Sequence, residues 1–163
     1  MQELNEKLIL DSFVNASKRE IADITFPANF ETIDWDTQDF FGWRDPKLPK
    51  RAYAVIPQGD AAIAAVLLTR SSNDANTRAQ CSWCQDVNLP NPVILYGAKR
   101  PKRVKSTYSS IAALVCEDFQ CSRNARTVIP MDYEGFDPGL IRENQIKKLR
   151  ERSAAFVARL LQQ

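Results

Sequence analysis

The chain has 163 residues, of which 44% are hydrophobic and 26% are charged, which is typical of a soluble globular domain and excludes a disordered or fibrous protein. It contains four cysteines and no histidine. Mechanisms that need an imidazole within the chain, such as Ser-His-Asp hydrolysis or a His-ligated catalytic zinc, are therefore excluded. Residues 1–45 carry 4 basic and 10 acidic residues (net −6), whereas residues 46–163 carry 18 and 10 (net +8). An acidic leading segment thus precedes a basic body.

Targeting and membrane signals are lacking in the sequence. No stretch approaches the length of about 18 apolar residues that spans a bilayer, and the first residues lack the basic region of a signal peptide. We therefore expect a cytoplasmic protein without a membrane partner, in which thiols stay reduced.

The first 51 residues predict a helix followed by an ordered loop. Apolar residues from Leu4 to Ile24 recur mostly at steps of three and four, which predicts one amphipathic helix that ends before Pro27. We expect residues 1–26 to form a helical lead. The segment 27–51 combines three prolines with a group of aromatic residues. We expect four of these to pack against the body rather than form an exposed patch: Trp35, Phe40, Phe41 and Trp43.

Residues 52–116 predict two antiparallel hairpins. Apolar runs at 52–56 and 62–69 flank a turn of Pro57 to Asp60, although the second run is rich in alanine and is compatible with a helix. Residues 71–80 are polar and predict a loop. Strands are predicted at 92–97 and 107–116, joined by a basic stretch that would form a charged tip.

The chain ends in a predicted long amphipathic helix. Asp137 can cap it, Pro138 suits its first position, and an apolar stripe runs to Leu161 through Leu140, Ile141, Leu149, Phe156 and Leu160. The predicted fold is therefore α+β, with an antiparallel sheet and amphipathic helices at both ends.

All four cysteines fall into two close pairs. Cys81 and Cys84 form a C-x2-C knuckle, and Cys116 and Cys121 form a C-x4-C pair after 31 intervening residues. The C-x2-C spacing lets both sulfurs reach one ion at about 2.3 Å, and four thiolates would close a tetrahedral shell with no open position. We therefore predict one structural Zn²⁺ ion, held by a domain that spans residues 27–163.

Three other interpretations of the cysteines stay open at this point. Disulfides are disfavoured in a reducing compartment, and a thioredoxin-like redox pair needs a βαβ context that the neighbouring residues do not supply. Cys116 follows an apolar run and is also compatible with a buried, unliganded thiol. The carboxylates between the second pair, Glu117 and Asp118, are better interpreted as solvated or helix-entry carboxylates than as general bases.

Several motifs together resemble a known family. The segments Gly42–Pro46 and Arg51–Ile56, combined with the two cysteine pairs, resemble the elongation factor G-binding proteins of the FusB type, which are fusidic acid resistance proteins. The resemblance implies a treble-clef zinc finger without enzymatic activity that binds elongation factor G and promotes its release from the ribosome. Two features differ: Cys116 stands where the family has a histidine, and about one helix replaces a larger N-terminal helical bundle.

The resemblance also implies a partner surface. In the family, this surface includes a lysine and a tyrosine three residues apart, shortly before the third zinc ligand, and Lys105 and Tyr108 have that relation here. It also includes an aromatic residue near the zinc knuckle, for which Trp83 is the nearest candidate.

The basic stretch that joins the last two predicted strands is a second candidate surface. It contains Lys99, Arg100, Lys102, Arg103 and Lys105 and emerges between the two zinc half-sites, which we expect to hold it rigidly. Such a loop suits either an acidic protein surface or RNA. The alternative function is therefore an RNA-binding zinc module, and in either case we expect a monomer.

Overall fold

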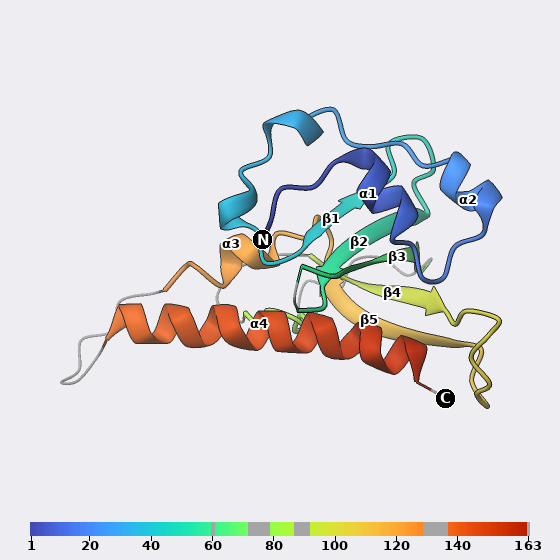
Figure 1. Cartoon of the computed structure of the whole chain (residues 1–163). Coiled ribbons are helices and arrows are strands. Elements are labelled where there is room, and N and C mark those ends of the chain that lie inside the picture. Colours follow the sequence, from blue (N-terminus) through green and yellow to red (C-terminus); the bar gives the residue numbers. More distant parts are fainter. Residues whose placement is uncertain (60, 72–78, 87–91, 129–136, 163) are drawn as a thin grey trace.

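A five-stranded antiparallel sheet organises the protein. The computed structural model describes residues 1–59, 61–71, 79–86, 92–128 and 137–162, so most of the loop predicted at 71–80 lies outside the described residues. The strands follow one another in space as in sequence (Figure 1): β1 Phe41–Arg44, β2 Arg51–Pro57, β3 Ile63–Arg70, β4 Val93–Lys99 and β5 Ser110–Cys116. The predicted α+β class and both predicted hairpins are confirmed.

The central strands are mostly apolar because both faces of the sheet are covered. In β2, Ala54 and Ile56 face one core cluster, whereas Tyr53 and Val55 face the other. The alanine-rich run of β3 pairs residue by residue with β2, so it is a strand and not a helix. Coverage on both faces explains why these strands lack the polar alternation of a half-exposed sheet.

A long helix, α4 Pro138–Leu161, covers the face of the sheet that carries Ala54 and Ile56 (Figure 1). As predicted, it begins at Asp137, whose carboxylate accepts hydrogen bonds from the backbone N–H groups of Gly139 and Leu140. The predicted stripe holds only in the second half of the helix. Leu140 is 56% exposed and Ile141 is half-buried, and the side chains buried against the body begin later: Leu149, Ser153, Phe156, Val157 and Leu160.

The N-terminal segment covers the opposite face, but the prediction of one helix is wrong. Two short helices form instead, α1 Glu6–Asp11 and α2 Lys18–Ala22. Between them the backbone extends along β3, where Ala65 donates to Ser12 at 3.0 Å and accepts from Val14 at 2.9 Å. Ser17 then starts α2 through a capping box with Glu20. These local bonds and the bridge to β3 outweigh the helical periodicity of the apolar residues.

The aromatic residues of the segment 27–51 pack inward, as predicted. Phe40, Phe41 and Trp43 are buried and Trp35 is half-buried. Trp43 stacks on Phe41 with ring centroids 4.9 Å apart, and its indole N–H donates to the Thr25 carbonyl at 3.0 Å. The segment is more regular than a loop, because it contains η1 Phe30–Thr32, η2 Trp35–Thr37 and the edge strand β1.

None of the helices in the described parts of the chain has the length and apolar character needed to cross a bilayer.

The edge strand β1 is held by a residue far along the chain. Phe119 lies directly over Gly42, and a Cβ atom built on Gly42 would lie 2.5 Å from the Phe119 ring. Its ring also packs against Phe40 and Tyr96. Glycine at position 42 is therefore required by close packing and not by backbone conformation.

We predict that Gly42→Ala destabilises the protein by about 1–3 kcal/mol, because the added methyl group must displace the Phe119 ring. Gly97→Ala is the matched control, since a Cβ on this second strand glycine has no neighbour closer than 3.8 Å. Thermal unfolding of the zinc-loaded variants checks this. Equal stability of the two variants would contradict the packing role of Gly42.

Candidate metal centre

The four cysteines converge from three different segments. Cys81 and Cys84 lie in the turn that precedes β4, Cys116 is the last residue of β5, and Cys121 begins the short helix α3 Cys121–Asn124. All four Sγ atoms lie within 4.8 Å of one another, with Cys81 and Cys121 3.6 Å apart and Cys84 and Cys116 also 3.6 Å apart. A tetrahedral zinc with sulfur at about 2.3 Å requires sulfurs about 3.8 Å apart, so the cluster fits this ion.

Each cysteine pair sits on a tight turn that needs a left-handed residue. Gln85 has φ of 54° and donates to the Cys81 carbonyl at 3.0 Å, and Phe119 has φ of 56° and donates to the Cys116 carbonyl at 3.0 Å. This conformation is uncommon for residues other than glycine, and it persists only where the surroundings enforce it. We attribute it here to the requirement that both sulfurs of each pair point to one centre.

Hydrogen-bond donors point at the sulfur atoms. The backbone N–H of Trp83 donates to Cys81 Sγ at 3.4 Å, and the Asn124 amide donates to Cys116 Sγ at 3.5 Å and to Cys84 Sγ at 3.8 Å. Four thiolates around a dication carry a net charge of −2, which such donors partly offset. Asn124 was not among the site residues predicted from the sequence. The signal that could have indicated it is its spacing, because a polar residue about one helical turn after Cys121 lies on the same face of the helix.

The ionisation of the thiols supports cation binding. Hydrogen bonding to Cys116 above all lowers the pKa of Cys81 and Cys84, whereas burial raises the pKa of Cys121. A bound dication would supply the charge that lets all four thiols ionise together. Cys84 is half-buried and the other three cysteines are buried, which suits a closed structural site.

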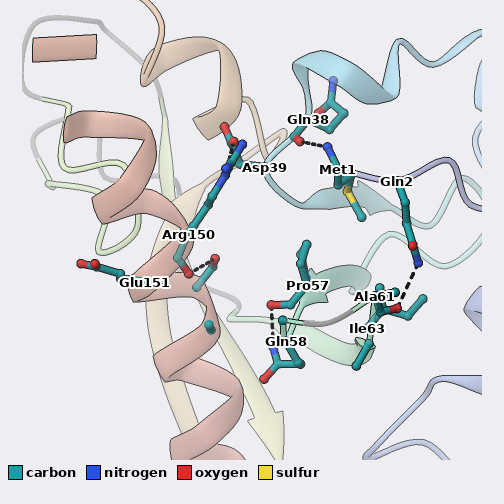
Figure 2. A pocket seen from close by; sticks show the side chains of 14 residues that line it. Met1, Gln2, Gln38, Asp39, Pro57, Gln58, Ala61, Ile63, Arg150 and Glu151 are labelled. Carbon is teal, nitrogen blue, oxygen red and sulfur yellow. Dashed lines mark hydrogen bonds and ion pairs between the residues drawn. The ribbon is translucent and has the colours of Figure 1, made fainter. Parts of the chain in front are cut away.

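Helix α3, which carries Cys121, is tied to the rest of the protein by a buried carboxylate. The side chain of Asp39 is fully buried and forms an ion pair with Arg150 of α4 at 2.8 Å (Figure 2). It also pairs with Arg126, and its backbone N–H donates to Ser122 at 3.0 Å. The same region holds the chain start, since the amino group of Met1 donates to the Gln38 carbonyl at 2.7 Å. Asp39 therefore links the aromatic segment, the metal centre and α4.

The two acidic residues between Cys116 and Cys121 also have structural roles. Glu117 pairs with Arg44 and Arg70, each at 3.0 Å, and Asp118 pairs with Arg44 at 3.1 Å. These contacts fasten the second knuckle to β1 and β3. The interpretation as solvated or helix-entry carboxylates misses these pairs, although the side chain of Asp118 is exposed.

The predicted partner residues separate into two groups. Trp83 is only 1% exposed and packs between Phe40 and Phe156, so its side chain cannot touch a partner on this surface. Arg100 is half-buried and donates to the carbonyls of Leu160 and Gln162 at the end of α4. The remaining predicted residues are exposed at the β4–β5 end: Lys99, Lys102, Arg103, Lys105 and Tyr108.

We predict that Cys81→Ser loses the metal and most of the tertiary structure, because a structural zinc site contributes on the order of 10–16 kcal/mol to folding. Ser82→Ala is the control, since Ser82 is exposed between the two ligands and its backbone N–H, which the substitution keeps, donates to the Leu114 carbonyl at 2.7 Å. Elemental analysis and near-ultraviolet circular dichroism check this. A folded, zinc-free Cys81→Ser protein would contradict the structural role of the centre.

Comparison with known proteins agrees with this geometry. The sequence model of the FBP C-terminal treble-clef zinc-finger family matches residues 8–160. Similar solved structures include that of the fusidic acid resistance protein FusC, with a TM-score of 0.48 and 23% identity over 67% of this chain and 52% of the FusC chain. A search of curated proteins found no match. The chain therefore belongs to the FBP C-terminal treble-clef zinc-finger family, as its motifs predicted.

Proposed function

We propose that this protein is a non-enzymatic binding module, stabilised by one zinc ion, whose partner is translation elongation factor G. The observation that carries the proposal is the family match over residues 8–160, which joins the cysteine cluster and the upstream motifs in one unit. The metal centre supports a binding role, because four thiolates leave no ligand position for a reacting water. The chain spans about half the length of FusC. Binding to the factor and its release from the ribosome are therefore proposals for this chain.

The proposed action is release of the factor from the ribosome, as in fusidic acid resistance. A binding protein shifts a conformational equilibrium only by the difference in its affinity for the two states. The module would therefore bind most tightly the form of elongation factor G that leaves the ribosome readily. It would act as a monomer in the cytoplasm, with residues 27–163 as the zinc-binding domain and residues 1–26 as its lead.

The exposed tip of the β4–β5 hairpin supports a partner surface at Lys105 and Tyr108. Tyr108 is 73% exposed, and Lys105 is exposed on the same connection. Tyrosine combines a large contact area with little loss of side-chain entropy, and it is among the residue types that dominate binding energy at interfaces. The adjacent lysine adds charge complementarity to an acidic partner.

We predict that Tyr108→Ala weakens binding to purified elongation factor G by about tenfold and Lys105→Ala by about threefold, since a buried aromatic anchor contributes more than a rim charge. Isothermal titration calorimetry measures both. Lys147→Ala, which removes an exposed charge from α4, is the control and keeps wild-type affinity.

Zinc content and melting temperature are measured for every variant. We expect both to stay unchanged, because Lys105 and Tyr108 are exposed and lie away from the metal centre. Zinc-loaded wild-type protein that fails to bind the factor would refute the proposed function. Wild-type affinity in both variants would refute only the proposed surface.

A further inference from the structure

A basic pocket lies beside the β4–β5 tip, apart from the metal centre. It has a volume of about 610 Å³ and is formed by the extended segment after α1, the start of α2, β2, β3 and the beginning of the β4–β5 connection. Its lining includes three apolar residues, Val14, Leu67 and Pro101, all half-buried. The volume is in the range of small-molecule and nucleotide sites, which runs from about 300 to 1,000 Å³.

The lining is strongly positive. One carboxylate, Glu20, faces five cations: Arg51, Lys99, Arg100, Lys102 and Arg103. Glu20 is already engaged, because one of its oxygens accepts from the backbone N–H and the hydroxyl of Ser17 at 2.8 and 2.7 Å. The pocket therefore has excess positive charge that its own acidic residue does not neutralise.

Two arginines of the pocket have buried nitrogen atoms that lack a hydrogen-bond acceptor within the described part of the chain. These atoms are Nη1 of Arg51 and Nε of Arg100. Arg51 Nη1 forms a long ion pair with Asp23, whose carboxylate oxygen lies 3.9 Å away, beyond hydrogen-bonding distance. Buried polar groups are nearly always satisfied, and an unsatisfied guanidinium nitrogen is a reason to look for an external acceptor.

The walls of the pocket are rigidly held. Arg100 donates from Nη1 to the carbonyls of Leu160 at 3.0 Å and Gln162 at 2.6 Å, which fixes its guanidinium to the end of α4. Asn15 bonds to both backbone groups of Leu67 and to the Lys99 carbonyl, at 2.8 to 3.0 Å. The donors are thus preorganised, which lowers the entropic cost of binding a ligand.

We propose that this pocket binds a phosphate group of single-stranded RNA. Guanidinium groups form paired hydrogen bonds with the oxygens of a phosphate. The apolar wall can contact the nucleoside attached to that phosphate, whereas an acidic side chain of a protein has no comparable group. The exposed cations Lys102, Arg103 and Lys105 continue the positive charge along the connection, as a repeating polyanion requires. This site goes beyond the proposed contact with elongation factor G, and the pocket itself contains neither Lys105 nor Tyr108.

Fluorescence anisotropy with a labelled RNA of about 12 nucleotides tests the proposal on the full, zinc-loaded chain. We expect Arg51→Gln to weaken RNA binding about tenfold and Lys102→Gln about threefold, with a salt dependence that falls by about 0.7 in log–log slope for each lost phosphate contact. Lys147→Gln on α4 is the matched control and keeps wild-type affinity and slope.

Two controls make the result specific. A labelled glutamate-rich peptide of equal charge binds much more weakly than RNA if the site recognises phosphate, and equal binding of the peptide would overturn the proposal. Equal RNA affinity of Arg51→Gln, Lys102→Gln and Lys147→Gln would overturn it as well. Because Arg51 lies outside the Lys105 and Tyr108 surface, Arg51→Gln keeps its affinity for elongation factor G, so failure of either proposal is seen separately.

Discussion

The convergence of four cysteine sulfurs is the constraint on which the rest of this structure depends. It joins the turn before β4, the end of β5 and the start of α3. A structural zinc contributes on the order of 10–16 kcal/mol, and a whole domain is stable by about 5–15 kcal/mol. The free energy supplied by zinc binding at such a centre is therefore about as large as the net free energy of unfolding of a whole domain. The packing of Phe119 on Gly42 and the ion pairs of Glu117 transmit its geometry to the edge of the sheet.

The β4–β5 hairpin separates the metal centre from the proposed binding surfaces. Val93 pairs with Cys116 at one end of the hairpin, and Lys99 pairs with Ser110 at the other. At about 3.4 Å per residue, the charged tip lies about 20 Å from the zinc end. The zinc half-sites therefore lie at the opposite end of the hairpin from the tip, to which the paired strands β4 and β5 connect them. The hydrogen bonds of Arg100 to the end of α4 and of Asn15 to Lys99 fasten the start of the connection near the tip.

Local signals in the sequence predict most of the fold and the whole ligand set. The cysteine spacing, the turn at Pro57 and the Asp137 cap are short-range patterns whose geometry follows from neighbouring residues. The N-terminal helix is predicted wrongly because its interruption depends on pairing with Ala65, which is distant in sequence. Trp83 illustrates the same limit: its place in the knuckle is evident, but its burial against Phe40 and Phe156 depends on elements far along the chain.

The basic pocket could not be found from sequence for the same reason. Its residues come from four separate regions, and only the stretch from Lys99 to Arg103 is visible as a pattern. Asp39 is similar, because nothing near it in the sequence indicates that Arg126 and Arg150 lie beside it. Contacts between single charged residues that are far apart in the sequence leave no periodic pattern. They depend on how the segments that cover the two faces of the sheet pack together.

X-ray absorption at the zinc edge tests the central claim most directly. The purified protein should contain one zinc per chain, coordinated by four sulfur atoms at about 2.3 Å and no lighter ligand. A coordination shell that includes nitrogen or oxygen, or fewer than four sulfurs, would contradict the closed structural site from which this account is built.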